Sequence, residues 1–212
     1  KNPRRKAWQQ EHRTLADVQS DFSSKANISR LNGEPSGGLT DVDLDADEAI
    51  ETASEFLPDT SMIHGRASKP RSHHWYNCDP SIKTVRWHDV DGAVLLELRS
   101  SGSQTLIPPS VHPEGEKLEW AANGTPGQAH PEQLVRACTC IAICALMARN
   151  WPAISGHRHD LANALAGFLL RRGVDDDLVI KIVRTAAKVA GDEEWIERGN
   201  TARHTARKIK TA

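Results

Sequence analysis

Three carboxylates alternate with apolar residues in the segment DVDLD at residues 41–45. In a β-strand alternate side chains share a face, so the three carboxylates would line one face while the apolar residues enter the core. Aligned carboxylates repel one another unless a cation neutralises them, and a hard divalent ion suits them. A calcium loop is excluded, because Ala46 and Thr52 stand where it needs glycine and glutamate. A solvated acidic edge is the competing interpretation.

A second polar segment, GRASKPRSHHWY, runs from Gly65 to Tyr76. It concentrates arginine, lysine and serine in a turn that leads into a predicted strand. Guanidinium and ammonium donors beside a hydroxyl suit the oxygens of a triphosphate. Strand alternation sends His73 and His74 to opposite faces, so only one of them can face the carboxylates. The alternative is a structural role, which a lone histidine on a strand has more often.

A third acid, Glu97, interrupts the apolar strand-like segment LLELR at residues 95–99. An unpaired charge at such a position is costly, so Glu97 needs a cation. A metal ion shared with the DVDLD strand would provide one. The alternative is an ion pair with Arg99, because residues two apart on a strand share a face.

Taken together, DVDLD, GRASKPRSHHWY and LELRSSGSQTLIPPSVHPEG resemble the catalytic motifs of the archaeo-eukaryotic primase superfamily. The likeness is to its bifunctional DNA primase/polymerase (prim-pol) branch, found on plasmids, phages and integrated elements. That family places an Asp-hydrophobic-Asp pair, a Ser/His motif and a further acid on three strands. Its acids hold two metal ions, and its histidine and nearby basic groups hold the incoming nucleotide. The resemblance covers nearly the whole chain, including a C-terminal segment similar to the family's helix-bundle domain.

The resemblance implies roles for individual residues. Asp43 and Asp45 match the metal-binding catalytic pair and Glu97 the third catalytic acid, with Asp41 as the alternative member of the pair. His73 is the preferred match to the family histidine, although Ser72-His73-His74 also fits a Ser-x-His motif with His74 as the ligand. The implied nucleotide-binding residues are Arg66, Lys69, Ser72, His73 and His112.

The implied activity is that of a metal-dependent nucleotidyltransferase, a primase or DNA polymerase. It would make primers or extend strands on single-stranded DNA from nucleoside triphosphates, using Mg²⁺ or Mn²⁺ in a two-metal site. Replication of a mobile element or phage is the expected setting, with a helicase domain or protein as a further partner. The sequence contains neither a P-loop nor a G-x-S-x-G motif, so ATPase activity and a covalent nucleophile are not expected.

Two other classes of function fit parts of the same pattern. A two-metal nuclease would use the same acids but would need no triphosphate pocket. A non-catalytic replication-initiator or DNA-binding module would keep the acids for structure alone. Nucleotide binding separates the three classes, because only the polymerase requires a triphosphate together with metal.

The elements that must position these residues differ between the two halves. Strand-like segments occupy residues 39–45, 73–76, 84–87, 94–99 and 104–107, with helical patterns at 15–22 and 47–56. Residues 121–131 bring Asn, Gly and Pro together and predict a linker. Helical patterns follow at 132–148, 160–172 and 175–190, then from Asp192 onward. We expect an α+β protein: a mixed or antiparallel catalytic domain at 1–127, N-terminally incomplete because no Met opens it, and a helical bundle at 128–212.

Charge is unevenly distributed along the 212 residues, whose net charge is −1. Residues 1–127 carry 14 Lys and Arg against 19 Asp and Glu, whereas residues 128–212 carry 13 against 9. Near the end, Arg203, Arg207 and Lys210 recur at helical spacing and predict a phosphate-binding stripe for nucleic acid. The alternative is a charged helix end exposed to water.

The four cysteines predict packing, with three of them in one helical segment. A zinc site that includes His157 or His159 is the weaker interpretation, because the paired short spacing of structural zinc sites is absent. A reducing, cytoplasmic compartment is therefore expected. No membrane partner is expected, because the longest apolar run, near residues 141–147, is too short to span a bilayer.

Overall fold

The computed structural model describes residues 14, 16–17 and 26–211, so the helix predicted at 15–22 lies almost wholly outside the described residues. The chain forms two compact units. The first contains the described residues up to Asp45, then Pro58–Trp87 and Leu96–Cys138. The second contains Ala46–Leu57, His88–Leu95 and the described part of Thr139–Ala212. The domain boundary predicted between residues 127 and 128 stays a prediction.

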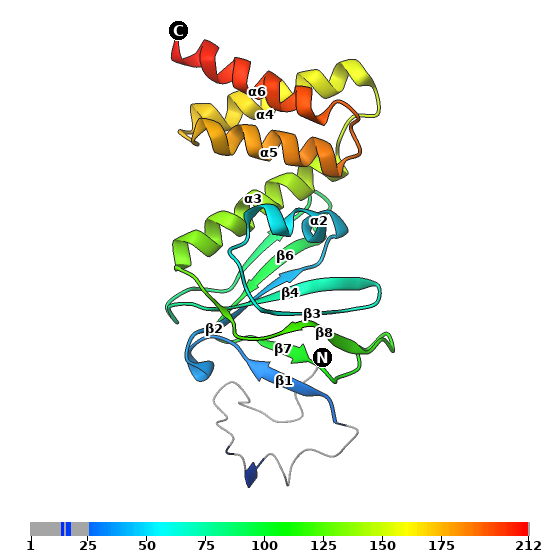
Figure 1. The fold of residues 1–212 in the computed structure, drawn as a ribbon, viewed down its shortest axis with the longest axis vertical. Helices are drawn as coiled ribbons and strands as arrows, with labels where there is room; N and C mark the ends of the chain where they lie inside the picture. The colour runs from blue at the N-terminus through cyan, green and yellow to red at the C-terminus, as the bar shows by residue number, and fades with distance from the viewer. Residues whose placement is uncertain (1–13, 15, 18–25, 212) are drawn as a thin grey trace. The chain divides into compact units, whose positions relative to one another are not determined.

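A seven-stranded sheet dominates the first unit (Figure 1). Its strands follow the order β5-β6-β2-β4-β3-β8, and β9 pairs with β4. The pairings of β2, β3, β4, β6 and β8 are antiparallel, whereas β9 joins β4 in parallel. The strands are β2 (Leu39–Leu44), β3 (Met62–Arg66), β4 (Lys69–Asn77), β5 (Val85–His88), β6 (Val94–Arg99), β8 (Leu118–Asn123) and β9 (Gly127–Gln128). A separate two-stranded sheet pairs β1 (Ile28–Leu31) with β7 (Gln104–Ile107).

Five α-helices complete the described chain, and the expected α+β class is confirmed. The segment predicted as a linker at 121–131 instead contains the end of β8 and all of β9. The helices are α2 (Asp47–Phe56), α3 (Pro131–Arg149), α4 (Ser155–Arg171), α5 (Asp176–Val189) and α6 (Trp195–Lys210).

The central strand β2 is buried along its whole length. Val42 and Leu44 are fully buried and lie opposite Leu98 and Leu96 of β6. Because side chains alternate along a strand, Asp41 and Asp43 lie together on the other face. The apolar face therefore fixes the register that brings both carboxylates to one surface of the sheet.

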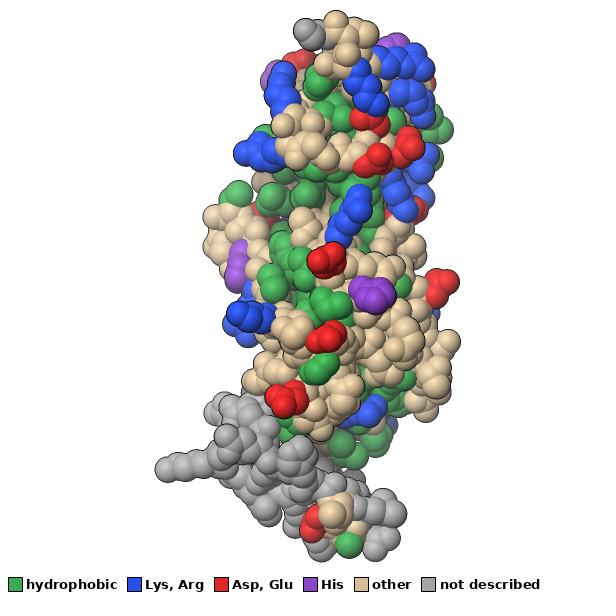
Figure 2. Space-filling model, turned by 90° about the vertical axis from the view of Figure 1, so that its left-hand side faces the viewer, with side chains coloured by type: hydrophobic (Ala, Val, Ile, Leu, Met, Phe, Trp, Pro, Cys, Tyr) green, Lys and Arg blue, Asp and Glu red, His purple; other side chains and the backbone are tan. Residues whose placement is uncertain are grey.

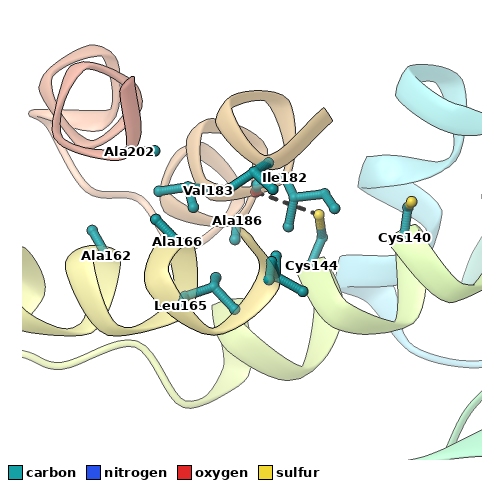
Figure 3. Close-up of a cluster of buried hydrophobic side chains, with 11 residues drawn as sticks. Cys140, Cys144, Ala162, Leu165, Ala166, Ile182, Val183, Ala186 and Ala202 are labelled. Atoms are coloured by element: carbon teal, nitrogen blue, oxygen red, sulfur yellow. Dashed lines mark hydrogen bonds between the residues drawn. The ribbon is translucent and has the colours of Figure 1, made fainter. Parts of the chain in front are cut away.

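Small side chains build the core of the helical unit (Figure 3). Ala162 and Ala166 of α4 pack with Ala186 of α5 and Ala202 of α6, and Ala at these positions lets helices approach closely. Asp175 caps α5 by accepting hydrogen bonds from the amides of residues 177 and 178. The packing predicted for the cysteines agrees with the burial of all four, of which Cys140 and Cys144 belong to this core.

Helix α3 is the one described helix with the length and composition that a membrane span requires. The helix has 19 residues, its most apolar 18-residue window has a mean hydropathy of 1.3, and 44% of that window is buried within the protein. Buried core helices of water-soluble proteins share these properties, so the feature is weak evidence for a membrane.

Candidate active site

A row of polar and aromatic side chains crosses five strands of the sheet at one level. Asp43 on β2 lies directly opposite Glu97 on β6 and His73 on β4. His73 in turn lies opposite His64 on β3, and His64 opposite Trp120 on β8. Directly opposed residues of antiparallel strands project from the same face, so the register gathers the predicted acids and histidine in one place.

A pocket opens beside this row. Both predicted metal-binding aspartates and every predicted nucleotide-binding residue line it, and Arg99 lines it as well. Neither Asp41 nor Glu97 belongs to its lining. The predicted residues that line the pocket are Asp43, Asp45, Arg66, Lys69, Ser72, His73 and His112.

Glu97 is engaged by two arginines. Its Oε1 accepts a hydrogen bond from Arg86 Nε at 2.7 Å and its Oε2 one from Arg99 Nε at 2.8 Å. Arg99 also reaches Asp43, with Nη2 2.5 Å from Oδ2. Burial would lower the pKa of Arg99, but the charges of Asp43 and Asp41 outweigh it and raise the pKa. The ion pair with Arg99, the alternative given above for Glu97, is thus present.

The donor set fits a divalent cation in part. Among the described residues, no group of three or more His, Cys, Asp or Glu side chains is arranged to hold a metal ion. Asp43 and Asp45 nevertheless share the pocket, and burial together with the charge of Asp43 raises the pKa of Asp45 to about 6. Two carboxylates that share one pocket suit a hard cation. The two aspartates fit such an ion, whereas the arginines occupy Glu97.

The two adjacent histidines have different surroundings. His73 Nδ1 lies 3.0 Å from Asp41 Oδ2 and 3.5 Å from Asp43 Oδ1. Burial would lower the pKa of His73, but the neighbouring charges of Asp43 and Asp41 raise it. His74 projects from the opposite face, where its Nε2 donates to the carbonyl of Arg71 at 3.0 Å. Burial lowers the pKa of His74 to about 4, so this ring is neutral near pH 7. His73, not His74, faces the acids.

Basic groups at the pocket are already engaged with polar partners. Arg66 forms an ion pair with Glu114, and its Nη1 lies 3.2 Å from His112 Nδ1. Lys69 donates from Nζ to the backbone carbonyl of Asp45. Arg66 and Lys69 also line the pocket, so an anionic ligand bound there would compete with their present partners for the same N–H donors.

Sequence reasoning missed His64 and left Arg99 outside the nucleotide-binding set. His64 is fully buried and stacks on His73, with ring centroids 4.3 Å apart and an interplanar angle of 4°. His64 directly precedes the GRASKPRSHHWY motif, so extending that motif by one residue would have included it. Arg99 was considered only as an ion-pair partner of Glu97. Because it lies two residues after Glu97 on the same strand face, it could also have been considered as a residue of the pocket.

The predicted phosphate-binding stripe lies on α6. Arg203, Arg207 and Lys210 are exposed, and Lys210 Nζ lies 2.6 Å from Asp176 Oδ2 on α5. Arg198, five residues before Arg203, is buried and donates from Nε to Asp192 Oδ2 at 2.9 Å. Figure 2 shows several Lys and Arg side chains on the surface of the helical unit. The exposed stripe therefore begins after Arg198.

Comparison with known families gives one assignment. Residues 1–133 match the family model described as "Bifunctional DNA primase/polymerase, N-terminal" (Prim-Pol). Comparison with curated proteins found no significant match. The matched residues include β2, β4 and β6, the three strands that carry the DVDLD acids, His73 and Glu97. Because the match covers more than half of the chain, the resemblance is confirmed, and the chain belongs to the bifunctional DNA primase/polymerase (Prim-Pol) family.

Proposed function

We propose that the chain is a metal-dependent nucleotidyltransferase that makes primers, or extends strands, on single-stranded DNA from nucleoside triphosphates. Family membership supports a primase/polymerase type of activity in general. One observation carries the specific proposal: a single pocket is lined by Asp43 and Asp45 and by all five residues predicted to bind nucleotide. Segments that lie far apart along the chain thus supply acidic and basic groups to one cavity.

Asp43 and Asp45 are the proposed ligands for Mg²⁺ or Mn²⁺. When bound, divalent ions in such a centre activate an attacking hydroxyl and neutralise a leaving pyrophosphate. Glu97 is the third acid of the family pattern, and its carboxylate holds Arg99 against Asp43. A direct part for Glu97 in a two-metal site therefore requires exchange of its arginine contacts. Otherwise Glu97 acts by placing the Arg99 guanidinium at the pocket.

The proposed triphosphate site uses the basic and hydroxyl groups of the pocket: Arg66, Lys69, Ser72, His73 and His112. His73 directs Nδ1 at the buried carboxylates, so Nε2 is the ring nitrogen left to meet a phosphate oxygen. Arg66 would exchange its contact with exposed Glu114 for the ligand. Positioning and charge neutralisation supply most of the rate in phosphoryl transfer, so no covalent nucleophile is needed.

The α6 stripe is the proposed contact for the template backbone. Arg203, Arg207 and Lys210 are exposed, and binding through such residues releases counterions from the nucleic acid. A helicase domain or protein remains the proposed partner for unwinding. A cytoplasmic location and a part in replicating a mobile element or phage complete the proposal.

The nuclease and the DNA-binding module remain the competing classes. A nuclease has no need of a pocket that gathers five phosphate-binding side chains beside its acids. A binding module would not need carboxylates that share a cavity with them. The composition of the pocket therefore favours the polymerase over both.

The test is incorporation of labelled nucleotides on a primed and an unprimed single-stranded template with Mg²⁺ or Mn²⁺. Labelled ribo- and deoxynucleoside triphosphates are supplied separately. We expect metal-dependent products longer than the primer, or new primers on the unprimed template. Shortened DNA without incorporation would indicate a nuclease, and DNA binding without either product would indicate the binding module.

A further inference from the structure

Asp41 occupies the most enclosed position of the acidic strand. Its side chain has no exposed surface. Its Oδ2 accepts a hydrogen bond from Thr105 Oγ1 at 2.7 Å and lies 3.0 Å from His73 Nδ1. Asp41 is therefore a buried carboxylate whose hydrogen-bonded oxygen is committed to two neighbours.

The pocket distinguishes Asp41 from the other two acids of DVDLD. Asp43 and Asp45 line the cavity, whereas Asp41 does not. The second oxygen of Asp41, Oδ1, accepts no hydrogen bond from any residue within the described part of the chain, but it is also fully buried. An ion in the pocket would contact Asp43 and Asp45, whereas Asp41 contacts Nδ1 of His73 on the side away from the pocket.

His64 provides a second constraint on the orientation of the His73 ring. The two rings stack nearly parallel, with centroids 4.3 Å apart. His64 is itself fixed, because Trp75 Nε1 donates to its Nδ1 at 2.9 Å and its Nε2 donates to the Leu106 carbonyl at 3.0 Å. That pattern requires the neutral tautomer with hydrogen on Nε2. Stacking thus sets the plane of the His73 ring, and Asp41 sets its rotation within that plane.

We propose that Asp41 is a positioning residue for nucleotide binding, which fixes His73 with Nδ1 inward and Nε2 toward the pocket, and is not a metal ligand. The inference rests on the proposed function, in which His73 contacts the triphosphate. It replaces the alternative in which Asp41 is a member of the metal pair. Buried groups that orient a ligand-binding histidine commonly change activity by about 10- to 100-fold when they are lost.

The experiment compares Asp41→Asn, Asp41→Ala and Thr105→Val with Asp43→Asn in the full chain. Each protein is titrated with a non-hydrolysable deoxynucleoside triphosphate and, separately, with Mn²⁺. The ¹⁵N signals of His73 are recorded at one fixed pH. Circular dichroism confirms folding, and if Asp41→Ala fails to fold, Asp41→Asn and Thr105→Val supply the comparison. A cycle with His73→Ala measures whether the two positions act together.

A positioning residue gives a graded series. Asparagine keeps an acceptor for His73, so nucleotide affinity should fall by about tenfold in Asp41→Ala and by less in Asp41→Asn and Thr105→Val. The His73 ¹⁵N signals should move in each variant, and Mn²⁺ affinity should stay at the wild-type value. In the His73→Ala background, Asp41→Ala should cause no further loss of nucleotide affinity.

Loss of Mn²⁺ binding in both Asp41 variants, as in Asp43→Asn, would overturn the inference and restore Asp41 as a metal ligand. Wild-type nucleotide affinity in folded Asp41 variants would overturn it as well. Failure of the proposed function has a separate signature, since the wild-type protein itself would then not bind the triphosphate.

Discussion

The sheet unit and the helical unit both bury charge, but they satisfy it differently. In the helical unit, buried Asp192 accepts hydrogen bonds from Arg198 at 2.9 Å and from Trp151 at 3.1 Å. In the sheet unit, Asp43 shares Arg99 with Glu97, and Asp41 keeps one oxygen without a hydrogen bond from the described residues. Both oxygens of Asp192 thus accept hydrogen bonds, whereas one buried oxygen of Asp41 has no hydrogen-bond donor among the described residues.

We infer from this difference that the helical cluster is structural, and we propose that the sheet cluster receives a ligand. Burying a charge is costly unless it is paired, so a fold keeps incompletely paired carboxylates only where something offsets the cost. Asp192 helps to begin α6 by accepting from the amide of Glu194 and from Arg198. Asp43 and Asp45 instead line a cavity together with the groups proposed to bind phosphate. Substitutions in the two clusters should therefore affect different properties.

The largest expected effect is on catalysis. Asp43→Asn should lower nucleotide incorporation by about a thousandfold, since loss of metal-based charge stabilisation is worth several kcal/mol and each 1.4 kcal/mol is tenfold. The fold should be kept, because Arg99 retains Glu97 as a partner. Single-turnover incorporation and thermal unfolding measure the two properties. Wild-type activity in Asp43→Asn would show that Asp43 does not belong to the active site.

Glu97→Gln should affect stability as well as activity. The carboxylate accepts from both Arg86 and Arg99, and hydrogen bonds to charged groups contribute about 1.5–3 kcal/mol. We expect the free energy of unfolding to fall by about that amount, measured by urea denaturation. Arg86→Gln is the matched control, because it removes only the more exposed partner. Unchanged stability in Glu97→Gln would contradict the ion-pair role and favour Glu97 as a metal ligand alone.

The two histidines provide the next comparison. His73→Ala should weaken binding of a non-hydrolysable nucleotide by about tenfold, the size of one lost charged contact of about 1.4 kcal/mol. His74→Ala should leave nucleotide affinity near the wild-type value, because its ring faces away from the acids and donates to the Arg71 carbonyl. Calorimetric titration of both variants measures the difference. The assignment is wrong if His74→Ala loses affinity and His73→Ala does not.

The helical cluster predicts a pH dependence of stability. Burial opposes the charge of Asp192, but hydrogen bonds from Arg198, the Glu194 amide and Trp151 outweigh it and lower the pKa. Because the folded-state pKa lies below the unfolded value of about 3.9, the contribution is complete above that pH and is lost as pH falls through the folded pKa. About 1.5 kcal/mol should be lost. Amide exchange in α6 below pH 4 measures it, and Asp192→Asn should flatten the response.

The smallest expected effect concerns the α6 stripe. Replacing Arg203 and Arg207 with Gln should reduce the slope of log affinity for single-stranded DNA against log salt by about 1.4, if both neutralise phosphates. Arg184 and Lys188, exposed on α5, form the control pair with the same change in charge. Equal slopes in both double variants would show that the stripe has no special part in DNA binding.

Local pattern predicted the elements that carry their own periodicity. DVDLD alternates with period 2, and β2 occupies Leu39–Leu44 as that pattern requires. The apolar spacing of residues 175–190 likewise predicted α5 (Asp176–Val189). The predicted linker at 121–131 was wrong as a description of local structure, because β8 and β9 exist through pairing with β3 and β4. Pairing between distant segments leaves little signal in Gly- and Ala-rich sequence.

The candidate site shows the same division. All five residues that the sequence predicted to bind nucleotide line the pocket, and all five lie within the quoted motifs. It assigned Glu97 to the metal site and kept the ion pair with Arg99 as the alternative. The sequence alone does not show that pair, since two residues on one strand face can pair or diverge with rotamer and register. It also left the part of Asp41 open, because only its hydrogen-bonding partners in the fold, Thr105 on β7 and His73 on β4, show where its carboxylate points.

A crystal structure of the protein with Mn²⁺ and a non-hydrolysable deoxynucleoside triphosphate would test the central claim most directly. The account predicts anomalous scattering from manganese at the carboxylates of Asp43 and Asp45, with the triphosphate within hydrogen-bonding distance of His73 and Arg66. Asp41 should remain bonded to His73 and apart from the metal. Manganese bound elsewhere, or a triphosphate outside this pocket, would contradict the assignment of the active site.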